Sequence, residues 1–371
     1  MKTCTRRAFV RGMATLGGMA AIAACAPTIS PTDTPVPSNP TPLAKAEAAS
    51  PVLATAAPTE VPASPMPSEV PVQAKATASV VATQASAETP TPVAKTPSPA
   101  PAEAAYLAVA RGASPEAITM RAVAAIGGIE RFAKKGYNVI IKPNICNANH
   151  GPEYASTTNP EVVATLVKLC LGAGAKSVRV LDYPFSGSAQ QAYVTSGIAE
   201  AVKAAGGEME LMAQMKFANT DIPNGKDIKK WSIYQPILQA DLVINVPIAK
   251  DHGLSRLTLA GKNLMGVIED RGSLHRNLHQ RLADLATLVK PQLTVIDAVR
   301  ILMANGPTGG NLKDVKQTNT VIASQDMVAA DAYATTLFGM TPEDIGYIRL
   351  SAQMGLGNMD LKSINIAELN V

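Results

Sequence analysis

Charged and polar side chains follow four apolar segments that are predicted to be strands. They are Lys142 with Asn144, Asp182, Lys250 with His252, and Asp297. A buried charge without a partner is costly, so each of these groups needs either a counter-charge or a ligand. Salt bridges at the rim of a sheet, for example Lys142 with Asp182, are one interpretation. The concentration of such groups at four strand ends favours a functional site.

A second group of polar side chains interrupts an apolar run with helical spacing. Lys262 and Asn263 lie inside the sequence TLAGKNLMG, residues 258–266. His275 and His279 follow at a spacing that puts both on one face if a helix extends that far. This spacing suits a pair of metal ligands, and it also suits histidines on a solvated polar face.

These residues support three interpretations. In the first, lysines neutralise the carboxylate or phosphate of a small anionic ligand, a histidine moves a proton and an aspartate orients the histidine. The residues expected in these roles are Lys142, Lys250 and Lys262, then His252 or His275, then Asp297. In the second, His252, His275 and His279 bind a metal ion with a carboxylate, for redox chemistry or structure. In the third, the domain is an interaction module. The three lysines favour the first interpretation, because they repel a cation.

Strands that alternate with helices must position these side chains. The expected strands are Tyr106–Ala110, Asn138–Ile141, Ser177–Leu181, Glu208–Met212, Asp241–Val246, Gln292–Ile296 and Thr320–Ala323. Helices are expected to start at Ser114-Pro115-Glu116, Asn159-Pro160-Glu161 and Thr341-Pro342-Glu343. This alternation predicts an α/β fold, a mainly parallel sheet with helices on both faces. Ligands of such sheets bind beyond the carboxyl ends of the strands, where we expect the lysines and histidines to converge.

The chain begins with features of an exported lipoprotein. Arg6 and Arg7 precede an uncharged run, as in substrates of the twin-arginine (Tat) translocase. The run then reaches Ala-Ile-Ala-Ala-Cys, in which Cys25 is the expected site of lipidation. We therefore expect residues 1–24 to be a signal peptide, and a lipid on Cys25 to anchor the exported protein at a membrane surface.

Residues 25–104 are predicted to be a disordered linker. The stretch from Ala26 to Ala104 holds 17 of the 28 prolines and contains neither glycine nor an aromatic residue. It cannot bury enough apolar surface to offset its chain entropy. Residues 105–371 are then left as a single α/β domain.

Charge and cysteine content disfavour two classes of function. Without the signal peptide the chain has 29 basic and 29 acidic residues, and no basic stripe suggests nucleic-acid binding. Beyond Cys25 the remaining cysteines are Cys146 and Cys170. Two thiolates are too few for the usual four-thiolate iron–sulfur cluster, so none is expected.

The motifs taken together resemble domain-of-unknown-function family 362. They are KPN at 142–144, NVPIAKDH at 245–252, TLAGKNLMG at 258–266 with His275, IDA at 296–298, NGP at 305–307, VAADA at 328–332 and GLG at 355–357. Members of this family often carry an added cysteine module similar to a ferredoxin, which this chain lacks. The resemblance implies an α/β domain with an unassigned reaction. It implies these site residues: Lys142, Asn144, Asp182, Lys250, His252, Lys262, Asn263, His275, Asp297 and Asp331.

We predict that Cys25→Ala leaves the protein exported but releases it from the membrane, since the thiol that would carry the lipid is lost. Cell fractionation with a high-salt wash measures this. Cys4→Ala, which changes a cysteine inside the signal peptide, is the matched control and should stay membrane-bound. A Cys25→Ala protein that still sediments with membranes would show that the anchor lies elsewhere.

Overall fold

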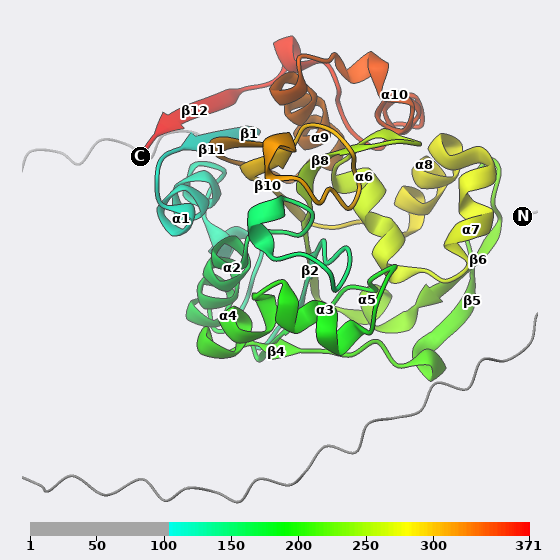
Figure 1. Cartoon of the computed structure of the whole chain (residues 1–371), viewed down its shortest axis with the longest axis horizontal. Helices are drawn as coiled ribbons and strands as arrows, with labels where there is room; N and C mark the ends of the chain where they lie inside the picture. The colour runs from blue at the N-terminus through cyan, green and yellow to red at the C-terminus, as the bar shows by residue number, and fades with distance from the viewer. Residues whose placement is uncertain (1–103) are drawn as a thin grey trace, which may run out of the picture. The chain divides into compact units, whose positions relative to one another are not determined.

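A ten-stranded, mostly parallel sheet runs through residues 104–371, the part of the chain that this computed structural model describes (Figure 1). The predicted signal peptide, Cys25 and nearly all of the predicted linker lie outside these residues. Eight strands follow the order β12-β1-β11-β10-β7-β2-β3-β4, β8 pairs with β10 and β9, and β5 with β6 forms a separate hairpin. The strands are β1 Leu107–Arg111, β2 Asn138–Pro143, β3 Ser177–Val180, β4 Glu208–Met209, β5 Phe217–Asp221, β6 Lys230–Tyr234, β7 Leu242–Val246, β8 Ile248–His252, β9 Arg256–Thr258, β10 Leu293–Leu302, β11 Val315–Ser324 and β12 Ile366–Asn370.

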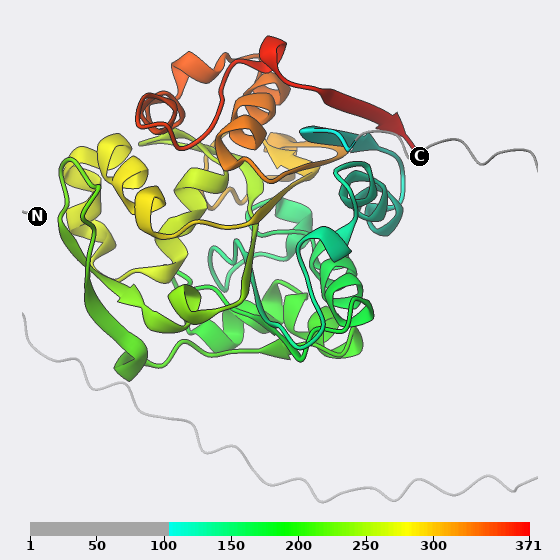
Figure 2. The same ribbon diagram turned by 180° about the vertical axis from the view of Figure 1, so that it is seen from behind.

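Helices cover both faces of the sheet (Figures 1 and 2). Val139 and Ile141 of β2 pack into a core shared with α1–α4, whereas Ile140 packs into a second core shared with α5–α10. This alternation follows from the two-residue period of a strand. The helices are α1 Pro115–Ala125, α2 Pro160–Gly172, α3 Ala189–Thr195, α4 Ile198–Ala204, α5 Gln235–Gln239, α6 Ala260–Asn263, α7 Arg271–Leu274, α8 Leu278–Leu288, α9 Met327–Thr335 and α10 Gly346–Gln353. The predicted fold class, a mainly parallel sheet between helices, is confirmed.

None of the helices in the described residues combines the length and the apolar character that crossing a membrane requires.

Two of the three expected helix starts are confirmed. The Ser114 hydroxyl caps α1 and the Asn159 side chain caps α2, each with a proline at the first helical position. The third start differs, because Pro342–Asp344 forms a single 3-10 turn. Asp344 closes a capping box with Thr341, and the extended backbone of Ile345 then separates this turn from α10.

The strand expected at Asp241–Val246 is followed at once by another. Pro247 has no N–H to donate, so β7 ends before it. The longer β10 continues beyond this point and offers its edge to β8, with Asp297 opposite Ile248. The sequence suggested that Lys250 lies just beyond the end of a strand. In the structure it lies inside one, β8. Strand β8 therefore forms because β10 is long enough to pair with it, and not because of the sequence pattern of residues 248–252.

Candidate functional site

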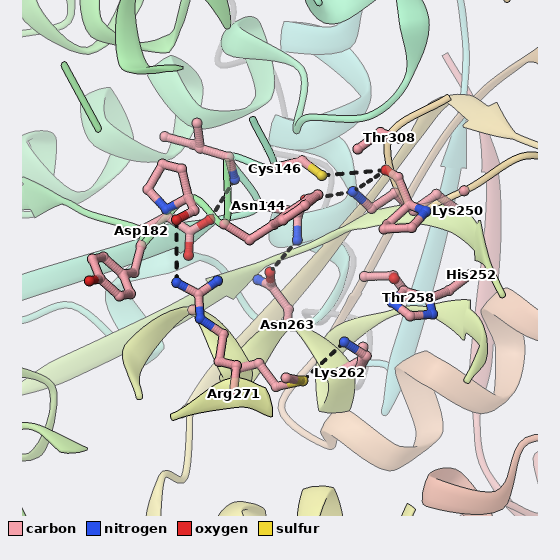
Figure 3. A pocket seen from close by; sticks show the side chains of 18 of the residues that line it. Asn144, Cys146, Asp182, Lys250, His252, Thr258, Lys262, Asn263, Arg271 and Thr308 are labelled. Atoms are coloured by element: carbon pink, nitrogen blue, oxygen red, sulfur yellow. Dashed lines mark hydrogen bonds between the residues drawn. The ribbon is translucent and has the colours of Figure 1, made fainter. Parts of the chain in front are cut away.

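A cavity of about 790 Å³ opens at the carboxyl ends of the parallel strands. The ends of β2 and β3, strand β8, the segment from Thr258 to His275 and the loop 306–308 surround it (Figure 3). Eight residues proposed from the sequence line it: Lys142, Asn144, Asp182, Lys250, His252, Lys262, Asn263 and His275. Residues far apart in the chain thus meet at the edge where ligands of parallel sheets bind.

A buried ion pair joins two strand ends at the base of the cavity. Lys142 Nζ lies 2.7 Å from Asp182 Oδ1, and both side chains are almost fully buried. The other oxygen, Asp182 Oδ2, accepts a hydrogen bond from Ile145 N at 2.6 Å. Burial lowers the pKa of Lys142 below its ordinary value, while the Asp182 carboxylate favours the charged form. The salt-bridge interpretation of these two residues is therefore correct, and the pair also faces the cavity.

Amides connect this ion pair to a second lysine. Asn263 Oδ1 accepts from Lys142 Nζ at 3.0 Å and from Asn144 Nδ2 at 2.9 Å. Asn144 Oδ1 in turn accepts from Lys250 Nζ at 2.9 Å. Asn245 Oδ1 accepts from Asn263 Nδ2 at 2.8 Å and so fixes the orientation of that amide. The network sets the positions of both lysines relative to each other.

Lys250 is held by neutral oxygens alone. Besides Asn144, its Nζ donates to Ser156 O at 2.6 Å and to Pro307 O at 2.9 Å. The loop that supplies Pro307 is fixed by Asp251 Oδ2, which accepts from Gly306 N at 2.8 Å. The three donor positions of the ammonium are used, and its charge is left uncompensated by a carboxylate within residues 104–371.

Lys262 has a different environment from the other two lysines. Its side chain is buried, with a residue exposure of 8%, and within the described part of the chain its Nζ donates only to Met265 Sδ, at 3.0 Å. A thioether is a weak acceptor. Burial, followed by the charges of Lys250 and Arg271, lowers the pKa of Lys262 to about 7. A substantial fraction of this side chain is therefore a neutral amine at neutral pH.

The two histidines at the cavity differ in what they can do. His252 Nδ1 accepts from Leu254 N at 3.1 Å and Ser255 N at 3.3 Å, which puts the ring proton on Nε2. Burial and the charge of Lys262 lower the pKa of His252 to about 3. His252 is therefore a neutral hydrogen-bond donor near pH 7. His275 is half-buried, burial lowers its pKa less strongly, and it is the better candidate to move a proton.

Asp297 and Asp331 do not line the cavity, in contrast to the expectation from the sequence. Asp297 accepts from Asn159 N at 2.7 Å and Val299 N at 2.9 Å, and it does not orient a histidine. Asp331 accepts from Ala260 N at 2.6 Å and Gly261 N at 2.8 Å. Both carboxylates bind backbone N–H groups, so their contribution to the site is to fix α2 and α6.

The expected set of three histidines is not assembled. His275 belongs to a 3-10 turn and His279 to α8, so no continuous α-helix carries both. The His279 ring stacks on Tyr347, with 6.2 Å between ring centroids, away from the residues that line the cavity. Within residues 104–371 no group of three or more His, Cys, Asp or Glu side chains is spaced to hold a metal ion.

The structure adds Arg271 and Thr258 to the site, and Cys146, which follows the Lys-Pro-Asn loop, also lines it. The Arg271 guanidinium lies 4.6 Å from the centroid of the Tyr183 ring and donates to Pro184 O at 3.3 Å. The Thr258 hydroxyl is buried and has no hydrogen-bond partner among the described residues. In the sequence Arg271 follows two acids, Glu269 and Asp270, and such mixed charged segments are usually exposed to solvent. Only its position two turns before α8, over the cavity, distinguishes it.

Several cations at the cavity have no carboxylate partner. Lys250, Lys262 and Arg271 form no salt bridge within the described residues. The acids at its edge are held by neutral donors, since Glu269 Oε2 accepts from Ser232 Oγ at 2.5 Å and Asp270 caps α7. The charges of Lys250 and Arg271 favour an anion in the part of the cavity that they face.

Comparison with known proteins identifies a family. Residues 139–336, just over half of the chain, match the family described as Domain of unknown function (DUF362). This match confirms the resemblance and contains all ten residues that the resemblance implied. It does not extend to the Gly355-Leu356-Gly357 motif.

One relative and two solved structures are similar to the chain. The thylakoid-associated protein sll1697 of Synechocystis sp. is 26% identical over 246 residues, which cover 62% of this chain and 72% of that protein. The lactate racemase apoprotein of Thermoanaerobacterium thermosaccharolyticum matches with 12% identity and a TM-score of 0.42, over 62% of this chain and 56% of that one. A protein from Thermotoga maritima matches with 10% identity and a TM-score of 0.37, over 66% and 60%. The matches span less than two thirds of either solved chain.

We expect Asp182→Asn to lower the free energy of unfolding by about 3 to 5 kcal/mol, because it leaves the Lys142 ammonium buried without its carboxylate. Denaturant unfolding measures the loss. Glu116→Gln, which breaks the exposed Lys168–Glu116 pair, is the control and should cost less than about 1 kcal/mol. Equal costs for the two variants would show that the buried pair does not stabilise the strand ends.

We expect Lys262→Met to be more stable than wild type, most of all at and below about pH 7. Unfolded lysine has a pKa of about 10.4, so between pH 7 and 10 the unfolded wild type binds more protons than the folded protein and wild-type stability rises with pH. The advantage of the variant should therefore narrow by about 1.4 kcal/mol per pH unit over this range. Unfolding curves at several pH values measure it, with exposed Lys316→Met as the control. A constant difference would contradict the lowered pKa.

Proposed function

The chain belongs to the DUF362 family, and from this membership together with its cavity we propose that it binds, and transforms, a small anionic ligand with a carboxylate or phosphate group. The observation that carries the proposal is the positive charge of Lys250 and Arg271, which line the cavity and have only neutral hydrogen-bond partners within residues 104–371. Retaining such charge is costly in the absence of an anion. A bound anion would supply the missing counter-charge.

The size and lining of the cavity indicate a ligand with an apolar part. A volume of about 790 Å³ is more than a simple carboxylate or phosphate fills, and it lies within the range of cavities that hold larger organic molecules. Phe185 and Leu254 line the cavity and are also 56% and 64% exposed to solvent. They therefore form an apolar rim where the cavity opens to solvent. We infer that the anionic group lies inward and an apolar body contacts this rim.

Neutral donors complete the site. His252 Nε2–H and the unpartnered Thr258 hydroxyl are available to an oxygen of the ligand. His275 is half-buried at the same cavity and supplies a group that gains or loses a proton. Charge, fixed donors and one titrating group are the elements of a proton-transfer site, which supports a reaction in addition to binding.

We further propose that the domain acts outside the cytoplasm. The support is the twin-arginine pair followed by the lipidation sequence at Cys25, with a proline-rich linker between Cys25 and the domain. A lipid there and the linker would place the cavity at some distance from a membrane surface.

Arg271→Gln tests the binding proposal, because it removes the one cavity guanidinium and keeps hydrogen-bonding capacity. We expect inorganic phosphate or 4-methylpentanoate at millimolar concentration to raise the melting temperature of the wild type, and to raise that of Arg271→Gln much less. Arg276→Gln, which changes a neighbouring exposed arginine that does not line the cavity, should respond as the wild type does. No shift in the wild type with either anion would overturn the proposal.

A further inference from the structure

We propose that Lys262 is a nucleophilic amine that forms an imine with the carbonyl group of an anionic oxo acid bound in the cavity. This inference rests on the proposed function and specifies its substrate class, a 2-oxo acid with an apolar body. Among the lysines that line the cavity, Lys262 alone has an amine without a strong acceptor within residues 104–371.

The three cavity lysines are divided by their hydrogen bonds. Lys142 forms an ion pair with Asp182, and Lys250 donates to three oxygen acceptors within 2.9 Å. Both amines are therefore held as ammonium groups, which have no lone pair to attack a carbonyl carbon. Lys262 donates to a thioether sulphur only. Its Nζ can leave Met265 Sδ at little cost, since a sulphur acceptor is weak. A lysine used for structure would instead be expected to have a carboxylate or carbonyl partner.

The surroundings keep this amine in its reactive form. Neighbouring cations and burial both disfavour the ammonium, which is a recognised way of activating a lysine towards carbonyl groups. The cations responsible, Lys250 and Arg271, are the same groups that would attract the carboxylate of an oxo acid. One arrangement of charge therefore serves both to bind the acid and to keep the nucleophile neutral.

The remaining polar groups fit the two steps of imine formation. The Nζ lone pair forms a bond to the carbonyl carbon, the carbonyl π pair moves to the oxygen, and a proton that leaves nitrogen reaches that oxygen to give a carbinolamine. The hydroxyl then departs with a second proton as water while the nitrogen pair completes the C=N bond. His252 Nε2–H and the Thr258 hydroxyl are placed at the cavity to hydrogen-bond the oxygen, and His275 to carry the proton.

Reductive trapping with cyanoborohydride tests the inference on the full-length chain. The probe is 4-methyl-2-oxopentanoate at about neutral pH, where exposed lysines are mostly protonated. We expect the wild type to gain the mass of the oxo acid less one oxygen atom. Peptide mapping should place this adduct on Lys262 at a level about tenfold or more above any other lysine, including exposed Lys168 and Lys316. Lys262→Met should lose the adduct, and 4-methylpentanoate, which has no carbonyl group, should give none.

Thermal shifts with the same two acids separate this inference from the proposed function. If both acids stabilise the wild type but no adduct forms on Lys262, or the adduct is spread evenly over the lysines, the imine is wrong and the anion-binding proposal stands. If neither acid nor inorganic phosphate stabilises the protein and no adduct forms, both proposals fall. Stabilisation together with a Lys262 adduct supports both.

Discussion

The buried pair of Lys142 and Asp182 is the interaction on which the rest of the site depends. It joins the ends of β2 and β3, and through Asp182 Oδ2 it also holds the backbone at Ile145. The chain after α6 passes directly over it. A Cβ at Gly266 would overlap both Asp182 Oδ1 and Lys142 Nζ, so only glycine permits this approach. The ion pair thereby fixes α6, and with it Lys262, against the carboxyl edge of the sheet.

Around this pair the polar groups divide into those that build the site and those that remain available to a ligand. Asn144, Asn245 and Asn263 use their amides on one another and on the lysines. Asp297 and Asp331 lie behind the cavity and bind backbone N–H groups. The available groups, Arg271, Lys262, His252, Thr258 and His275, are held by elements that these contacts fix in place. A reactive constellation of this kind needs such rigid support to keep its geometry.

The sequence predicted most of the fold, with instructive exceptions. The seven expected strands are present with shifted ends, because an apolar run between turn signals is a local property. Five strands were not expected, namely β5, β6, β8, β9 and β12, because pairing creates them. β12 is an edge strand that exists through its parallel contact with β1, at the other end of the domain. Asp297 does not line the cavity, because a carboxylate after an apolar run has the same sequence pattern whether it faces a ligand or a backbone amide. Asp331, which only the family resemblance implied, lies inside α9 and also binds backbone N–H groups.

The sequence alone therefore determined the α/β class, the family and eight of the residues at the cavity. These features can be recognised within short segments of the chain, as hydrophobic periodicity, helix caps and polar groups that follow apolar runs. Tertiary structure decided what each of these residues does. Lys142, Lys250 and Lys262 look alike in sequence, yet one is paired with a carboxylate, one is surrounded by neutral oxygens and one is left nearly unpartnered. The charge and reactivity of a lysine depend on burial and on neighbours from distant parts of the chain, which only the folded protein brings within reach.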